Sequence, residues 1–227
     1  MTIFFTKGLL LVFALFLGHT LSGQANFTGN FEPNVAMNYK VATNYKHIFQ
    51  ITQRSTIYDE KLQLRARQLE ISHFSELKIA YNQSIALGLL YQFREAFDGA
   101  ENELRFTQQY DINHKRGSLR FGERLRAEQR IRPSLTTHRF RYRLAMDLPI
   151  SGEKLDVGEP YFVVSTESLL SVASGKSSQF DQRLTVNIGW LVNHTIKLEV
   201  GTQYRIVNYT QSIENALLLL TSLVLSL

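Results

Sequence analysis

His-Arg-Phe-Arg-Tyr-Arg-Leu-Ala-Met-Asp-Leu, at positions 138–148, shows the fold of this chain most plainly. Charged side chains occupy one parity of this stretch and apolar side chains occupy the other. In a helix such alternation would spread both kinds around the cylinder, whereas in a strand it makes one apolar face and one charged face. A soluble β-sandwich would not leave so much charge on one face and so many aromatic residues on the other. A membrane barrel does, because its outside meets lipid and its lumen is polar.

The same two-faced pattern recurs from about Tyr45 to the C-terminus, so the sequence predicts an all-β fold, a transmembrane antiparallel up-and-down barrel. The strand from about Pro33 to Ala42 runs towards the first short turn. An even, closed barrel then needs one more strand, in residues 26–32. We therefore expect about twelve strands, with ten as the alternative count.

The predicted connections alternate in length, which indicates the two ends of the barrel. Outer-membrane barrels have short periplasmic turns and longer outer loops, so we place the shorter set on the periplasmic side. The shorter turns are predicted at residues 43–44, 81–83, 114–117, 151–154 and 192–193, and the longer links near residues 59–60, 98–102, 132–137, 173–178 and 208–212.

The N-terminus is typical of a secretory signal peptide. Residues 1–7 carry one lysine, the apolar run at residues 8–18 has the length of a signal-peptide core, and the small residues Ser22 and Gly23 follow. An uncleaved anchor helix would need about 20 apolar residues. We therefore expect a cleaved signal peptide at residues 1–23, a single barrel domain at residues 24–227, and a place in the outer membrane of a Gram-negative cell.

Composition excludes several classes of function. The chain has no cysteine, so it has neither a disulfide framework nor a thiolate nucleophile or metal ligand. Its net charge of +5 comes from basic residues that alternate with apolar ones, and export argues against a nucleic-acid partner. The expected partners are outer-membrane lipid, the barrel assembly machinery and, in one hypothesis, small anionic solutes. We expect a monomer.

Several segments resemble the family of bacterial outer-membrane barrels known as domain of unknown function 2490. These are residues 125–132 followed by 138–144, the Glu159-Pro-Tyr-Phe strand with Glu167, and residues 180–184 leading to Gly189-Trp190. The resemblance extends from about Tyr39 to Tyr209. It implies a membrane barrel and no particular activity. The chain departs from most outer-membrane barrels at its end, Leu-Val-Leu-Ser-Leu, which lacks a terminal aromatic residue.

The charged parity predicts a cluster of ionisable side chains inside the barrel. A charge in a narrow lumen is costly unless it is paired, so we expect a structural ion-pair network that fills the interior. The alternative is a narrow, anion-leaning pore in which surplus arginines attract carboxylate or phosphate solutes. On adjacent strands, we expect Arg124 or Arg126 to pair with Glu103 or Asp147. The predicted lumen cluster is Arg105, Arg120, Arg124, Arg126, Arg139, Arg141, Arg143, Arg183, Glu103, Glu128, Asp147, Glu167 and Glu199.

A third hypothesis is an enzyme that modifies envelope lipid. Such barrel enzymes need a serine next to a histidine, or a histidine next to a carboxylate, near the lipid interface. His138 with Ser134 is the one pair that we single out. No spacing of histidines and carboxylates resembles a metal site. We therefore expect no enzyme activity, no catalytic or metal-binding residues and no cofactor.

Overall fold

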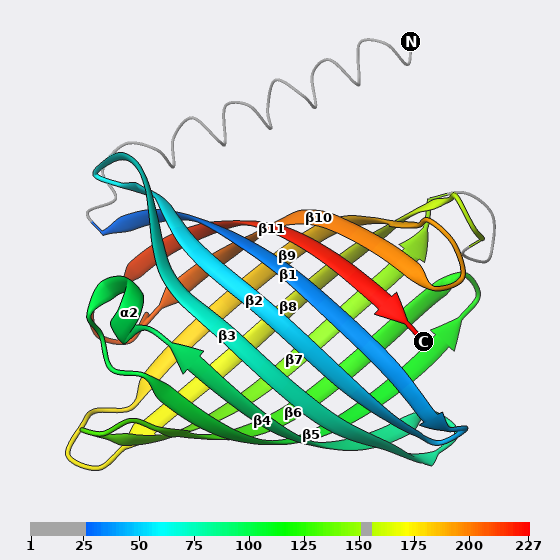
Figure 1. The fold of residues 1–227 in the computed structure, drawn as a ribbon, viewed down its shortest axis with the longest axis horizontal. Helices are drawn as coiled ribbons and strands as arrows, with labels where there is room; N and C mark the ends of the chain where they lie inside the picture. The colour runs from blue at the N-terminus through cyan, green and yellow to red at the C-terminus, as the bar shows by residue number, and fades with distance from the viewer. Residues whose placement is uncertain (1–25, 151–155) are drawn as a thin grey trace.

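The computed structural model describes residues 26–150 and 156–227, and in these residues the chain forms one closed β-barrel (Figure 1). Each strand pairs antiparallel with the next one along the chain. A four-residue helix, α2 (Glu95–Asp98), lies between β4 and β5. The strands are β1 (Phe27–Ala42), β2 (Tyr45–Asp59), β3 (Lys61–Ala80), β4 (Gln83–Phe93), β5 (Glu103–Arg116), β6 (Leu119–Ile131), β7 (Thr136–Pro149), β8 (Pro160–Ala173), β9 (Gln179–Leu191), β10 (Ile196–Val207) and β11 (Glu214–Ser226).

The all-β barrel is confirmed, and its strand number falls between the two expected counts. Residues 26–32 do not form a separate strand, because β1 runs without a break from Phe27 to Ala42 and covers them. The described barrel therefore has an odd number of strands, eleven. The first and last strands consequently run in the same direction, and β1 pairs with β11 in parallel. The expectation of a purely antiparallel barrel is wrong at this one seam.

The two ends of the barrel differ as predicted, with two exceptions. The turns after β1, β3 and β5 have two residues each, and the turn after β9 has four, as many as the link after β6. Leu227 lies at the same end as these turns, where its amide donates to the carbonyl of Asn38 at 2.8 Å. The opposite end has the link with α2 and the links after β6, β8 and β10. One exception is the link after β2, which is the single residue Glu60, with φ +60°. The other is the connection from β7 to β8, where the predicted turn at 151–154 lies outside the described residues.

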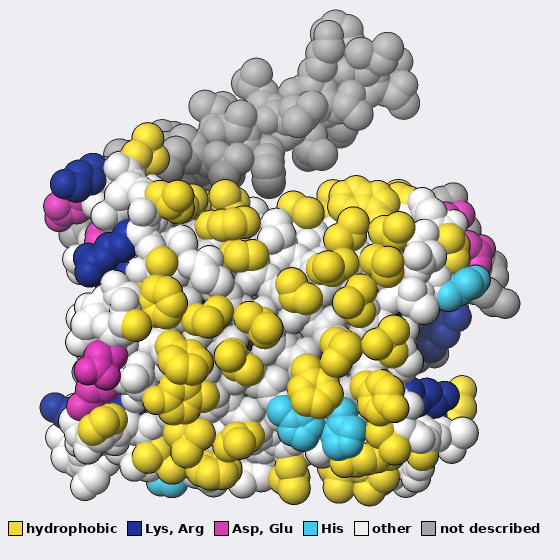
Figure 2. All heavy atoms as spheres, viewed as in Figure 1, with side chains coloured by type: hydrophobic (Ala, Val, Ile, Leu, Met, Phe, Trp, Pro, Cys, Tyr) yellow, Lys and Arg dark blue, Asp and Glu magenta, His cyan; other side chains and the backbone are white. Residues whose placement is uncertain are grey.

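Apolar side chains cover the outside of the barrel wall. Figure 2 shows them over the strands of one face, while the basic and acidic side chains gather at the two ends. Leu144 of β7 is 42% exposed and Ile188 of β9 is 39% exposed, although both lie within strands that pair on both sides. The inward side chains are mostly polar and buried. No helix in residues 26–150 or 156–227 is long and apolar enough to cross a membrane.

Two inward aromatic rings lie directly on glycines of the neighbouring strand. Phe74 of β3 faces Gly88 of β4, and Tyr161 of β8 faces Gly189 of β9. A Cβ atom at either glycine would overlap the ring. The absence of a side chain at these two positions is what lets a large ring lie flat against the inner wall, as aromatic side chains do over glycines in other sheets.

Candidate functional site

The predicted cluster lies on the inner face of the barrel wall, mainly on β5 to β9. Its members on one strand share parity, and neighbouring strands bring them together in register: Glu128 lies opposite Arg139, and Arg143 lies opposite Glu167. Charges that are far apart in the sequence thus form a continuous layer across the interior.

Glu103 is the most enclosed member of the cluster, with 0% of its surface exposed. Its Oε1 accepts from Nη2 of Arg105 at 2.6 Å and from Nε of Arg130 at 2.7 Å. Its Oε2 accepts from Nε of Arg132 at 2.8 Å. One carboxylate therefore balances part of the charge of three guanidinium groups. Charge-assisted bonds of this kind are stronger than neutral ones and offset the cost of burying the carboxylate.

Arg141 connects two further carboxylates in the middle of the layer. Its Nη1 donates to Glu128 at 2.7 Å, and its Nη2 donates to Oε2 of Glu167 at 2.8 Å. Arg183 approaches Glu167 from the other side, with 3.3 Å between Nη1 and Oε2. Glu128 is 2% exposed. The carboxylates on β6 and β8 are thus linked through the arginine on β7 between them.

The specific pairs expected from the sequence are wrong, although their members do lie on the inner face. Arg124 pairs with Asp111 at 2.7 Å, and Asp147 pairs with Arg120. Arg126 donates from Nε to Oε1 of Gln109 at 2.9 Å. The pairings follow the strand register, in which Arg124 lies opposite Asp111, Arg126 opposite Gln109 and Arg120 opposite Asp147. That register is set by turn positions that the sequence shows only approximately.

Several arginines have little or no carboxylate compensation. Within the described ranges, Arg143 has no carboxylate oxygen within 4.0 Å. Arg126 comes no nearer than 3.8 Å to Glu128 and lies over the ring of Phe74, 5.3 Å from its centroid. Arg139 donates from Nε to the hydroxyl of Ser171 at 2.7 Å. Neutral acceptors and an aromatic face thus take the place of carboxylates.

Glu199, the remaining carboxylate of the predicted cluster, contacts a tyrosine. The hydroxyl of Tyr161 donates to its Oε1 at 2.6 Å. Tyr161 is the ring that lies on Gly189, so this bond attaches the aromatic side chain to β10 as well as to β9. The sequence analysis placed Tyr161 in the Glu159-Pro-Tyr-Phe strand and did not include it in the predicted cluster.

Sequence reasoning missed part of the network. Arg132 lies next to Pro133 in a predicted link, yet it donates to Glu103. Glu32 of β1 accepts from Nε of Arg54 at 2.6 Å, and Arg205 lies 3.5 Å away. Glu32 has the parity of the inward residues of β1. It was missed because the sequence analysis began this strand at Pro33. Asp181, 3.9 Å from Arg139, was also missed, although it has the parity of Arg183.

Ser134 and His138 make no hydrogen bond with each other in the described part of the chain. The hydroxyl of Ser134 donates to Glu101 at 2.5 Å. His138 lies in β7 on the parity of Phe140, which faces outward. This pair is not arranged for nucleophilic catalysis.

A second group of histidines lies on the outer wall. Nδ1 of His47 is 2.9 Å from Nε2 of His73 and 3.4 Å from the hydroxyl of Ser75, and Phe49 stacks on His73. A serine nucleophile needs a histidine whose opposite ring nitrogens contact the serine and the orienting group. Here both partners meet the same nitrogen, so the group lacks that arrangement. The described residues contain no set of three or more histidines and carboxylates that could hold a metal ion.

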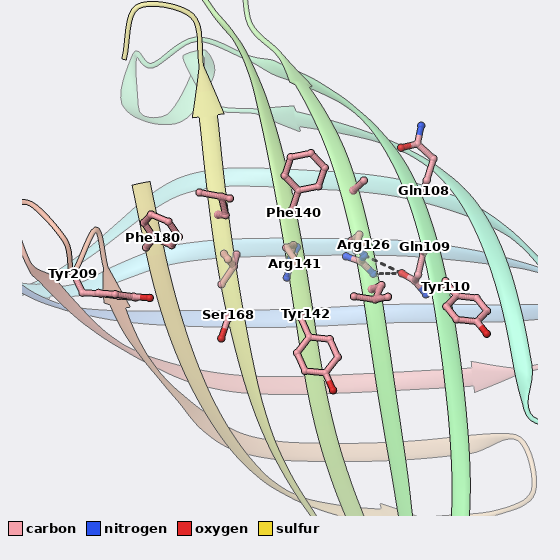
Figure 3. A pocket seen from close by; sticks show the side chains of 14 residues that line it. Gln108, Gln109, Tyr110, Arg126, Phe140, Arg141, Tyr142, Ser168, Phe180 and Tyr209 are labelled. Atoms are coloured by element: carbon pink, nitrogen blue, oxygen red, sulfur yellow. Dashed lines mark hydrogen bonds between the residues drawn. The ribbon is translucent and has the colours of Figure 1, made fainter. Parts of the chain in front are cut away.

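The outer wall of β5 to β9 contains a shallow hollow with a volume of about 660 Å³. Figure 3 shows Phe140 and Tyr142 on its sides, Tyr209 at its edge, and Arg126 bonded to Gln109 at its floor. The residues that line the hollow therefore include three members of the inner face, Gln109, Arg126 and Arg141.

Comparison with known sequences supplies a family and no named relative. No curated protein matches the chain. The family described as "Protein of unknown function (DUF2490)" matches residues 33–216, which include all of β2 to β10 and most of β1. The chain therefore belongs to the DUF2490 family.

Proposed function

We propose that this protein is an integral barrel of a Gram-negative outer membrane, with an interior closed by an ion-pair network. In this proposal it is a passive, structural component of the membrane with no enzyme activity. It enters the membrane after removal of residues 1–23 and with the help of the barrel assembly machinery, and it is a monomer whose partners are lipids.

The apolar outer wall supports the membrane location. Large apolar side chains stay exposed along the middle of the strands, where a water-soluble barrel would place polar ones. Because the barrel is closed, every described strand is paired on both sides. A structure that crosses lipid must satisfy its backbone hydrogen bonds in this way, since the bilayer core contains no water.

The burial of Glu103 is the observation that best supports the proposal of a closed interior. A carboxylate with 0% exposure, in contact with arginines from β5, β6 and the link after β6, leaves little space for a solute at that level. Arg141 fills the next level in the same way between Glu128 and Glu167.

Two measurements test the proposal. Fractionation of expressing cells and N-terminal sequencing should find the chain in outer membranes, beginning near Gln24. Recovery from the cytosol with Met1 intact would refute the membrane location. Purified protein in planar bilayers should give no steady conductance.

A narrow anion-selective pore is the second candidate, and Arg143 is the observation that favours it. Its guanidinium has no carboxylate within 4.0 Å in the described ranges, so it is available to a passing anion. If the pore exists, Arg143→Gln should lower the preference for chloride over potassium and leave the fold intact. Arg141→Gln is a poor probe because it also removes the partner of Glu128 and Glu167. Absence of conductance in the wild type would exclude this candidate.

A further inference from the structure

The mouth of the barrel at the end with the longer links contains a basic pocket of about 500 Å³. We call it the basic vestibule and define it by Arg130, Arg132, Arg139 and Lys176, which line it. These residues come from the end of β6, the link after β6, the start of β7 and the link after β8. Two hairpins, β6 with β7 and β8 with β9, thus bring cationic side chains to one place.

Carboxylates lie behind the vestibule and not on its surface. No Asp or Glu is among the described residues that line it. Arg130 and Arg132 both use Nε to bind Glu103, which Arg105 also binds. These are the only side-chain hydrogen bonds of Arg130 and Arg132 among the described residues, so their Nη groups remain available.

Arg139 is under-compensated in the same way. Its Nε donates to Ser171, and its Nη2 is 3.9 Å from Asp181, a long distance for an ion pair. Asp181 also accepts from Gln179 at 2.9 Å and from the amide of Asn208 at 3.0 Å. The charge on Arg139 therefore exceeds what its wall contacts balance.

The opposite mouth shows that this excess is not a general property of the barrel ends. A pocket of about 450 Å³ lies there, lined by Lys40, Lys46 and Lys78, but Glu76 lines it too. Lys46 and Glu76 are 3.0 Å apart. That mouth contains its own carboxylate, Glu76, and its cations are lysines, which lack the fixed fork of arginine.

We propose that the basic vestibule binds a small phosphorylated solute. Several guanidinium groups directed to one place can donate to all the oxygens of a phosphate group. A carboxylate ligand, with two oxygens, would use fewer of these donors. The volume is that of a small-molecule site and exceeds what one phosphate needs, so the remainder of the ligand lies against the uncharged side chains of the rim. The uncharged polar side chains that line the vestibule are Thr137, Ser171, Ser177, Gln179, Asn208 and Gln211. The site needs only the folded barrel and is independent of whether the lumen conducts.

Calorimetric titration of the refolded mature chain with pyrophosphate tests this site. Arg139→Gln should weaken binding at least tenfold, and Lys176→Gln, on an exposed link, should weaken it about threefold. Lys40→Gln, at the opposite mouth, is the matched control and should leave the affinity unchanged. If Arg139→Gln impairs folding, as judged by heat-modifiable mobility in gels, Lys176→Gln decides the result. Unchanged affinity in Lys176→Gln, or equal losses in Lys176→Gln and Lys40→Gln, would overturn the proposal.

A second arm separates a soluble ligand from a lipid headgroup, which also carries phosphate. The titration is repeated in nanodiscs of phosphatidylcholine and of phosphatidylglycerol. Equal affinity for pyrophosphate in both lipids is the expected result. Weaker pyrophosphate binding in phosphatidylglycerol than in phosphatidylcholine, with a smaller difference in Lys176→Gln, would mean that the lipid headgroup competes for the site. That result would assign the site to lipid and overturn the proposal of a soluble ligand.

Discussion

The two sides of the barrel fill their interior by different means. In the sector from β5 to β9, the most buried inward side chain is Glu103, with 0% exposure, and it is held by arginines. In the closing sector of β10, β11, β1 and β2, it is Leu218 of β11, with 1% exposure. The first sector fills its interior mainly with linked ion pairs. The second does so mainly with apolar and uncharged polar side chains, around one ion-pair group in which Glu32 meets Arg54 and Arg205.

The closing sector uses short amide and hydroxyl groups to connect its strands. Asn34 of β1 donates to Ser222 of β11 at 3.0 Å and accepts from Thr52 of β2 at 2.9 Å. Asn30 accepts from Thr56 at 3.1 Å. Bonds of this kind have modest net energies, whereas loss of one partner of a buried ion pair leaves an uncompensated charge. We therefore expect the charged sector to be the more sensitive to single substitutions.

Glu103→Gln should have the largest effect. It leaves Arg105, Arg130 and Arg132 without their shared carboxylate, which should lower the free energy of unfolding by about 3–5 kcal/mol. The measurement is a guanidinium titration of the protein refolded in lipid vesicles. Glu214→Gln, on the exposed rim of β11, is the control and should change stability by less than about 0.5 kcal/mol. Similar effects of the two variants would remove the distinction between the sectors.

Leu144→Arg should have the next largest effect, because it places a charge on the outer wall of the charged sector. In bilayers the cost should be about 2–4 kcal/mol if the site is near the midplane. The control is Ala145→Arg, which faces inward and lies between Gly122 and Ser165 on the adjacent strands. The free energies of unfolding of both variants are measured in detergent-free vesicles. Equal losses at the two positions would show that the assignment of outward and inward faces is wrong.

Gly189→Ala tests whether Tyr161 must lie on the wall where the two sectors meet. The added methyl group would overlap the tyrosine ring, so Tyr161 would move and lose its bond to Glu199. We expect a loss of about 1–3 kcal/mol, as for other overpacked sites. At Gly122, a methyl group would meet only the Oδ1 of Asn113, at 3.3 Å, so Gly122→Ala should cost less. The reverse order in the same unfolding assay would contradict this packing.

Asn34→Ala should have the smallest effect of the four. It removes the amide that connects β2, β1 and β11, at a cost of about 1 kcal/mol, because only neutral hydrogen bonds are lost. The unfolding assay used for Glu103→Gln allows direct comparison. A loss as large as that of Glu103→Gln would mean that the closing seam, and not the ion-pair network, limits stability.

Parity predicted the barrel and the inward position of the arginines, because a strand alternates its faces strictly. It did not predict which charges pair, since a shift of register changes every partner without changing the face. The odd strand count was missed because β1 continues through Pro33, where the sequence analysis placed the start of a strand. Arg132 was missed because a loop residue has no parity, and its contact with Glu103 depends on how the link after β6 turns inward. The signal peptide lies outside the described residues and stays a prediction.

Reaction of a single cysteine with a small charged thiol reagent tests the closed interior most directly. The chain has no cysteine of its own, so each variant reports one position. Thr107→Cys lies on the inner wall opposite Glu128, where the threonine is 3% exposed, while Lys40→Cys and Lys176→Cys lie at the two mouths. We expect rapid labelling at both mouths and labelling at position 107 only after unfolding. Labelling of folded Thr107→Cys at the rate of the mouth positions would show a water-filled lumen and contradict the ion-pair closure.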